Sequence, residues 1–282
     1  MTCNALKNPK QVKAKPFIKW AGGKSQLLEE LINRVPKHFN RYFEPFLGGG
    51  ALFFALRPVI AHLSDINPEL INVYQVVRDN PDLLIEELSK HKYEKIYYYK
   101  IRNVDRYETF NNWSNTKRAA RLIYLNKTCF NGLYRVNSRG EFNVPFGRHK
   151  NPTICDTENL IACSELLQSA EISVKSFELA VKDARADDFV YFDPPYAPLN
   201  KTSNFTGYSK NGFDEAMQVK LKETCVELNR KGVKFMLSNS SAAIVLELYK
   251  DFNVEFVKAS RAINSNAAKR GKINEIIVRN YS

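Results

Sequence analysis

Apolar runs and helical patterns alternate along most of this chain. Runs that end at polar or turn residues predict strands, and leucine and isoleucine spacing in the segment from Ser25, a candidate N-cap, predicts a helix. Asn67 and Pro68 predict the start of another helix. Strands alternating with helices predict an α/β fold with a doubly wound, mostly parallel sheet. The predicted strands are residues 42–46, 59–65, 171–176, 188–193, 234–239, 254–259 and 274–281.

The pattern changes between about residues 70 and 150. Helical segments rich in Tyr, Lys and Arg come first, and a Gly, Asn and Arg segment with little periodicity follows at residues 131–152. We interpret this stretch as an inserted, mainly helical module. The predicted domains are therefore residues 1–70 together with 160–282, and residues 71–159.

Composition narrows the class of protein. The chain has 282 residues, of which 44% are hydrophobic and 26% charged, so it can bury a sizeable core. A formal charge of +12 favours a polyanionic partner, although solvated lysines alone would also give this charge.

The cysteines and the N-terminus indicate the compartment. The five cysteines form no CxxC pair and have no closely spaced histidines after them, so neither a zinc site nor a disulfide framework is indicated. The basic N-terminus lacks the apolar core of a signal peptide, and no apolar stretch is long enough for a membrane span. We expect a soluble cytoplasmic protein with no membrane partner.

A glycine turn follows the first predicted strand. Gly48, Gly49 and Gly50 allow close approach of a ligand to the backbone, and Asp65 ends the next strand 21 residues after Glu44 (65 − 44), where it can bind a ribose. This arrangement suits a nicotinamide, a flavin or S-adenosylmethionine equally. A tight turn beside an ordinary helix cap is the alternative.

A sharper motif ends the strand at residues 188–193. Asp193 is followed by Pro194, Pro195 and Tyr196, and prolines cannot continue a strand ladder. The amino group of a nucleobase is a poor nucleophile, so it needs acceptors that orient it, and Asp193 and the Pro194 carbonyl can serve. Tyr196 offers a ring on which a flipped base can stack. A generic Asp-Pro turn is the alternative.

With these motifs in this order, the chain resembles the Dam-type, alpha-class adenine-N6 DNA methyltransferases that act at GATC. The resemblance covers nearly the whole length. It implies a Rossmann-like class I S-adenosylmethionine-dependent methyltransferase that flips its target adenine. The matching stretches are FIKWAGGK, FEPFLGGG, DIN, NGLYR, EFNVPFGR, DPPY and NFT at residues 17–24, 43–50, 65–67, 131–135, 141–148, 193–196 and 204–206.

The resemblance also implies the cofactor site, which binds S-adenosylmethionine and no metal. A family position that often carries an acid for the cofactor's adenine is occupied here by Ser176 and Phe177. From the residues alone, Trp20 could equally belong to the core and Lys24 could be a solvated charge. The expected cofactor residues are Trp20, Lys24, Glu44, Pro45, Phe46, Gly48, Asp65, Ile66, Phe177 and Asp193.

For double-stranded DNA, the resemblance makes Arg135 the guanine reader and residues 71–159 the target-recognition module. Lys117, Arg118 and Arg121 add positive charge to the same module. The family includes enzymes paired with restriction enzymes, so a separately acting cognate restriction endonuclease is a candidate partner of an expected monomer in a bacterial or phage-host cytoplasm. The expected DNA-binding residues are Lys127, Asn131, Tyr134, Arg135, Arg139, Arg148 and Asn204.

Two alternatives stay open from the residues. Related motifs act on cytosine N4, RNA adenine or protein glutamine, although Asp at position 193 and the motif order favour DNA adenine. A catalytically silent DNA-binding regulator would keep the same fold, but the intact run from Asp193 to Tyr196 argues against it.

Overall fold

The computed structural model describes residues 12–24, 27–199, 213–260 and 272–282. In this part of the chain, seven strands form one sheet in the order β3-β2-β1-β4-β5-β7-β6. The first five strands of that order are parallel, and β7 runs antiparallel to both β5 and β6. The predicted doubly wound, mostly parallel sheet is therefore confirmed. The strands are β1 Tyr42–Glu44, β2 Ala61–Asp65, β3 Ala170–Val174, β4 Phe189–Phe192, β5 Lys234–Ser240, β6 Asn253–Ser260 and β7 Lys272–Arg279.

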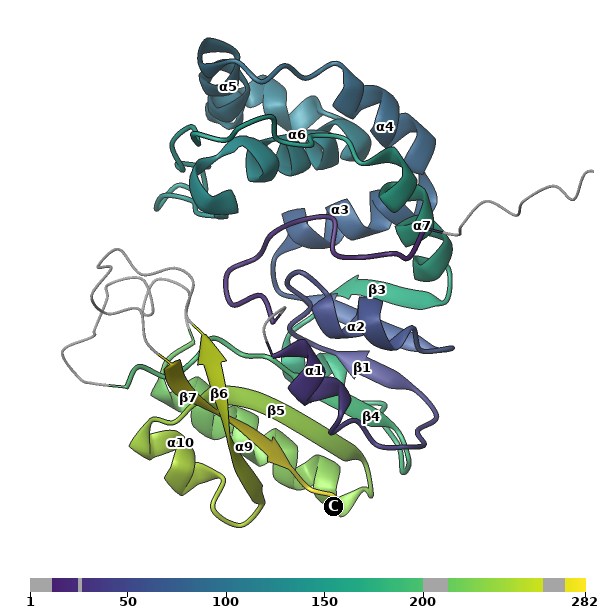
Figure 1. Cartoon of the computed structure of the whole chain (residues 1–282), viewed down its shortest axis with the longest axis vertical. Helices are drawn as coiled ribbons and strands as arrows, with labels where there is room; N and C mark the ends of the chain where they lie inside the picture. The colour runs from purple at the N-terminus through teal and green to yellow at the C-terminus, as the bar shows by residue number, and fades with distance from the viewer. Residues whose placement is uncertain (1–11, 25–26, 200–212, 261–271) are drawn as a thin grey trace, which may run out of the picture.

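Helices cover both faces of the sheet and form a further layer at one end of the molecule (Figure 1). Asn67 caps α3 by accepting from two backbone N–H groups, as its place before Pro68 predicts. Short 3₁₀ turns lie at Asn103–Arg106, Glu108–Asn112 and Phe130–Gly132. The helices are α1 Leu28–Ile32, α2 Ala51–Leu56, α3 Pro68–Asp79, α4 Pro81–Ser89, α5 Lys95–Arg102, α6 Asn115–Thr128, α7 Thr157–Leu167, α8 Phe177–Ala180, α9 Glu215–Arg230 and α10 Ala243–Leu248.

Successive side chains of the central strands enter two different cores. In β4, Phe189 and Tyr191 belong to the core formed with α1, α2 and α3, whereas Val190 and Phe192 belong to the core formed with α8, α9 and α10. All four are at most 1% exposed. Strands buried on both faces have no polar side, which explains why they appear in the sequence as continuous apolar runs.

The helical layer of α4, α5 and α6 lies beyond α3, at the end of the molecule remote from β6 and β7 (Figure 1). It has its own core, which includes Tyr98, Tyr124 and Phe142. The predicted boundaries at residues 70 and 159 fall inside α3 and α7, two helices that contact each other and connect the sheet with this layer. The division into two functional domains stays a prediction.

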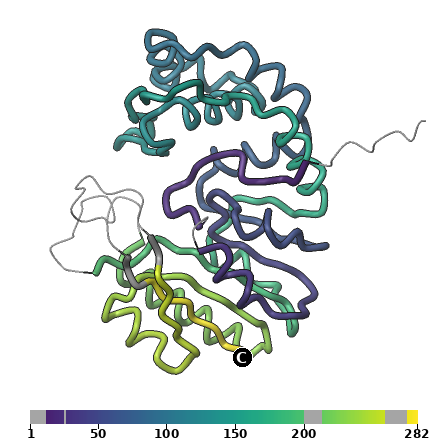
Figure 2. Tube along the Cα trace, in the orientation of Figure 1, coloured from purple at the N-terminus to yellow at the C-terminus, as the bar shows by residue number. Residues whose placement is uncertain are grey.

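The N-terminal segment joins the two parts of the molecule. Figure 2 shows it, in purple, running between the helical layer and the sheet. Lys15 exchanges two backbone hydrogen bonds with the Asn159 side chain, and Lys19 does the same with Asn126. Across the described ranges, no helix has both the length and the apolar character needed to cross a membrane.

Candidate active site

Asp193 follows directly on the buried strand β4, at the carboxyl edge of the sheet. Pro194, the next residue, is buried. Buried side chains hold the loop that follows: Gln218 Nε2 donates to the Pro195 carbonyl at 3.0 Å, and Asn239 Oδ1 accepts from the Ala197 N–H at 3.1 Å. Because Asn239 Nδ2 also donates to Gln218 Oε1, these clamps form one satisfied polar network. The start of the loop, at residues 195–197, is therefore preorganised.

Lys24 pairs with Asp193. Its Nζ lies 2.6 Å from Asp193 Oδ1 and donates to the Gly22 carbonyl at 2.8 Å. Lys24 is only 6% exposed, so the alternative in which it is a solvated charge is wrong. Burial raises the pKa of Asp193, and the Lys24 ammonium opposes this shift.

Tyr196 lies beside this ion pair. Lys24 Nζ is 4.5 Å from the centroid of the Tyr196 ring, which is a cation–π distance. The Tyr196 hydroxyl donates to Glu275 Oε2 at 2.8 Å. Burial, followed by the charge of Asp193, raises the pKa of Tyr196 well above its usual range, so its hydroxyl stays protonated and donates.

The glycine turn after β1 is fixed by Asp65. The Gly48 N–H donates to Asp65 Oδ2 at 3.1 Å, and the Asn67 N–H donates to Oδ1 at 3.0 Å. Gly48 has φ of +47°, and a Cβ there would lie 2.9 Å from Trp20 Cδ1. Glycine is therefore required by backbone conformation and by the close approach of Trp20. The Asp65 carboxylate has about four acceptor positions, so it can still accept from a hydroxyl group.

The carboxyl edge of the sheet also offers apolar surface. Ile66, directly after β2, is 75% exposed, and Val174, at the end of β3, is 50% exposed. Phe46 is partly exposed and stacks on Phe177, which is only 4% exposed, with ring centroids 5.5 Å apart. An apolar edge beside a carboxylate with free lone pairs fits the base and ribose of a nucleoside cofactor.

Two predicted pocket residues lie deeper than the rest. Pro45 is buried, and Glu44 is 3% exposed and accepts from the Tyr42 hydroxyl at 2.8 Å. Burial raises the pKa of Glu44 to about 8, and the Tyr42 hydrogen bond opposes the shift. Glu44 is therefore fixed within the core below the turn that its strand leads into.

Trp20 is partly buried and packs against the edge of the core. Its indole stacks on Tyr134, with ring centroids 5.0 Å apart. A residue predicted for the cofactor thus contacts a residue predicted for DNA.

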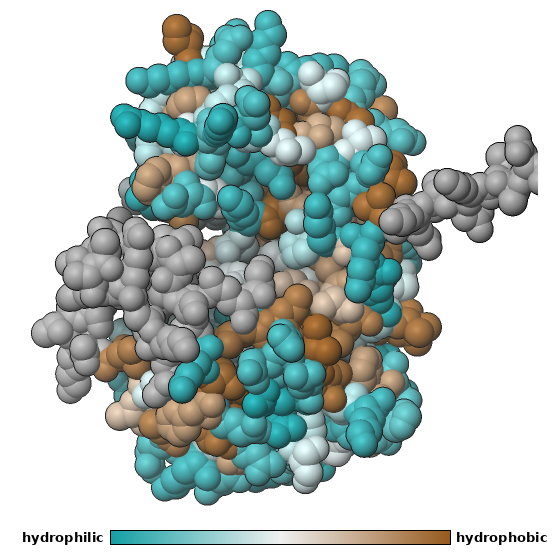
Figure 3. Space-filling view, in the orientation of Figure 1, coloured by the Kyte–Doolittle hydropathy of each residue, from teal (hydrophilic) through white to brown (hydrophobic). Residues whose placement is uncertain are grey.

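The predicted DNA-binding residues that the structure describes fall into two environments, exposed and half-buried. Arg135 is exposed, and its Nε donates to Asn143 Oδ1 at 2.6 Å; Arg139, Arg148 and Asn131 are also exposed. Lys127 is half-buried, which lowers its pKa. Asn204 lies outside the described residues. Hydrophilic side chains dominate the helical end of the face in Figure 3.

Two arginines of the module have structural partners. Arg121 is 6% exposed and forms a 2.7 Å ion pair with Asp105, and Arg118 pairs with Glu69. Arg121 was expected to add positive charge to the module for DNA, but its guanidinium is buried and also donates to the Ile101 and Arg102 carbonyls.

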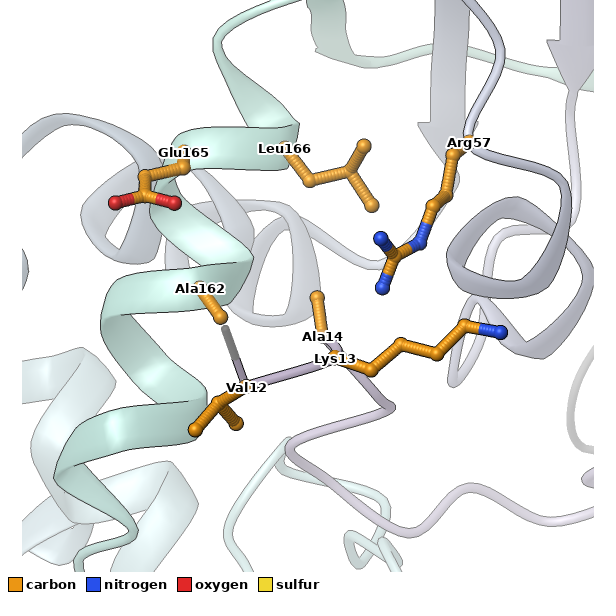
Figure 4. Close-up of a pocket in the computed structure, with 7 residues that line it drawn as sticks. All are labelled: Val12, Lys13, Ala14, Arg57, Ala162, Glu165 and Leu166. Atoms are coloured by element: carbon orange, nitrogen blue, oxygen red, sulfur yellow. The ribbon is translucent and has the colours of Figure 1, made fainter. Parts of the chain in front are cut away.

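A cavity of about 440 Å³ lies elsewhere, between the N-terminal segment, the end of α2 and α7. Figure 4 shows Arg57 and Leu166 reaching into it near Ala14 and Lys13. None of its lining residues belongs to the set around Asp193. Within the described ranges, no group of three or more His, Cys, Asp or Glu residues is arranged to hold a metal ion.

The strand order and the edge built from Asp65, the glycine turn and Asp193 define a class I S-adenosylmethionine-dependent methyltransferase. Residues 20–263 match the family model described as D12 class N6 adenine-specific DNA methyltransferase. The chain belongs to this family, and it is accordingly an adenine-specific DNA methyltransferase that uses S-adenosylmethionine and acts on DNA.

Individual relatives are similar in sequence to this chain along nearly its full length. The chain is 50% identical over 275 residues to the Type II methyltransferase M1.LlaDCHI of Lactococcus lactis subsp. cremoris, which covers 96% of this chain and 97% of the relative. It is 44% identical over 292 residues to the Type II methyltransferase M.MjaIII of Methanocaldococcus jannaschii, covering 96% and 100%. Identity to the DNA adenine methylase of Escherichia coli is 37% over 272 residues, covering 94% and 95%.

Proposed function

We propose that Asp193, Pro194 and Tyr196 form the reaction centre for N6 methylation of an adenine flipped out of double-stranded DNA. The observation that carries this proposal is the position of Asp193. It stands at the carboxyl end of the central strand β4, with Oδ1 paired to Lys24 and the Tyr196 ring beside it. Asp193 Oδ2 and the Pro194 carbonyl then accept from the adenine amino group, while the base stacks on Tyr196.

S-Adenosylmethionine supplies the electrophilic methyl group on a sulfonium, without a metal in our proposal. Asp65 would accept from the ribose, and the apolar edge at Ile66, Phe46 and Phe177 would hold the adenine. Trp20 and the Gly48 turn would enclose the remainder of the cofactor. Lys24 holds Asp193 ionised and oriented, and Glu44 and Pro45 support the turn from the core. Acceleration comes mainly from holding the reacting groups in line.

The helical layer is proposed as the target-recognition module. Arg135 reads a guanine in the major groove, and Arg139, Arg148, Asn131 and Lys127 contribute contacts to DNA, as does Asn204. We propose GATC as the target, since the motif order resembles enzymes that act there. We also propose that the enzyme is a monomer. The higher identity to two proteins named Type II methyltransferases supports a place beside a separate restriction endonuclease.

The mechanism is tested with Asp193→Ala. The variant should stay folded and bind DNA, yet transfer no tritiated methyl group to it. The exposed Asp251→Ala is the matched control and should methylate at the wild-type rate. Wild-type turnover by Asp193→Ala would refute the assigned role.

The target is tested in a methylation-deficient host that expresses this chain. Sequencing of modified adenines should find them in GATC. Modification at another sequence would refute the GATC assignment while leaving the reaction centre intact.

A further inference from the structure

The Tyr196 ring needs side-chain contacts that fix its orientation. The residue follows β4 in a loop, outside the ladder of the sheet, and a tyrosine side chain turns about two torsions. A base stacks well only on a ring whose plane is held in the productive orientation. In the proposed function, which this inference takes as its basis, that ring is the platform for the flipped adenine.

Two side chains contact the ring from different parts of the sequence. Lys24 Nζ lies over one face at 4.5 Å from the centroid. At the far end of the ring, the hydroxyl donates to Glu275 Oε2 at 2.8 Å. A hydrogen bond to a carboxylate is stronger and more directional than one to a neutral acceptor. The Glu275 contact therefore fixes the ring's position.

Glu275 is itself placed by the sheet. It lies on β7 opposite Ser240 of β5, in antiparallel register. Ser240 Oγ donates to the Ala197 carbonyl at 2.6 Å, so these two cross-strand partners hold two successive residues of the loop, Tyr196 and Ala197. The next residues of β7, Ile276 and Ile277, are completely buried.

We propose that Glu275 is a positioning residue for methyl transfer, which orients the Tyr196 ring by accepting the hydrogen bond from its hydroxyl. It touches neither the adenine amino group nor the transferred methyl group. Its contribution reaches the reaction only through Tyr196.

The test is a double-mutant cycle with Glu275→Ala and Tyr196→Phe, measured as the single-turnover rate of methyl transfer at saturating S-adenosylmethionine. Each single variant should lose about 10- to 100-fold, the range that corresponds to one hydrogen bond to a charged group. The double variant should lose no more than either single variant, because both changes remove the same contact. Binding of S-adenosylmethionine should be unchanged in Glu275→Ala.

Two further variants separate orientation from simple stability. Glu275→Gln keeps an oxygen acceptor and should recover most of the rate. Glu255→Ala, on the neighbouring strand β6, removes ion pairs to Arg34 and Arg279 without reaching the loop, and should methylate at the wild-type rate.

Tyr196→Ala distinguishes failure of this inference from failure of the proposed function. If Tyr196→Ala is inactive while Glu275→Ala keeps the wild-type rate, the role of Glu275 is refuted and the reaction centre stands. Additive losses in the double variant, or a Glu275→Gln rate as low as that of Glu275→Ala, would equally refute it. Wild-type activity of Tyr196→Ala would overturn the stacking platform and this inference together.

Discussion

The Trp20 indole stacks on the Tyr134 ring, with centroids 5.0 Å apart and planes inclined by 23°. Trp20 also lies against Gly48 of the turn after β1, so the stack connects that turn with the segment that follows α6. Beside it, the Asn126 side chain bonds to both backbone groups of Lys19. The glycine turn, which we propose binds the cofactor, is therefore connected to the helical layer through Trp20 and Tyr134.

The stack of Trp20 on Tyr134 predicts that a change in the helical layer weakens cofactor binding. Tyr134→Ala should reduce S-adenosylmethionine affinity about 2- to 10-fold, which corresponds to the ~0.5–1.5 kcal/mol of an aromatic pair. Tyr134→Phe keeps the ring and serves as the control. Isothermal titration calorimetry without DNA measures both, and equal affinity of Tyr134→Ala and wild type would contradict the prediction.

The Lys24–Asp193 pair predicts a pH effect. Burial raises the pKa of Asp193 and Lys24 lowers it, so Lys24→Gln should raise that pKa further. In the proposed function, an ionised Asp193 is the stronger acceptor for the adenine amino group. The acidic limb of the rate profile should therefore move to higher pH in the variant, at saturating cofactor. The exposed Lys90→Gln is the control, and superimposable acidic limbs would count against the assigned pair.

Arg135 and Arg139 offer a matched comparison in the recognition segment. Arg135→Ala should lose discrimination at one base pair by roughly 1–3 kcal/mol, because a bidentate guanine contact is lost. Arg139→Ala, in which an exposed charge is removed, should weaken binding to all sequences alike. Competition binding with single-substitution duplexes measures both effects. A uniform loss for Arg135→Ala would make it a phosphate contact instead.

Glu44 predicts a stability that depends on pH. Its pKa is raised from 4.5 to about 8 by burial, so the folded state holds a proton that the unfolded state releases. This contribution is fully present below about pH 4.5 and is lost as pH rises through about 8. Thermal unfolding of Glu44→Gln should show a smaller decline in Tm over that window than wild type. The exposed Glu29→Gln should keep the full decline, and parallel curves for Glu44→Gln would refute the prediction.

The sequence was sufficient for the strands of the sheet, whereas the N-cap predicted at Ser25 lies outside the described residues and α1 begins at Leu28. All seven predicted strands are present, and the central ones, which are buried on both faces, leave a local apolar signal that ends at turn residues. The start of α3 at Asn67 and Pro68 is also confirmed, since capping depends on neighbouring residues alone.

The site was only partly predictable, because long-range partners leave no local signal. The residues next to Arg121 in the sequence do not distinguish it from an exposed arginine. It is buried because it pairs with Asp105 and donates to two backbone carbonyls of another segment. Likewise, nothing near Glu275 in the sequence indicates that strand register brings it to Tyr196. Asn239 was predicted only as the end of a strand. Its hydrogen bond to the Ala197 N–H could not be predicted, because it depends on how β4 and β5 pair in the folded sheet.

The order of strands has a consequence for how the protein folds during synthesis. Tyr42 of β1 pairs with Phe189 of β4, 147 residues later (189 − 42). One edge of β1 therefore stays unpaired until more than half of the chain has been synthesised after it. The contact from Glu275 to Tyr196 forms only when the final strand has left the ribosome. Such late, non-local pairing slows folding. A chain that stops before β7 would carry every motif that supports the resemblance, yet it would lack the Glu275 carboxylate that accepts from Tyr196 in the proposed reaction centre.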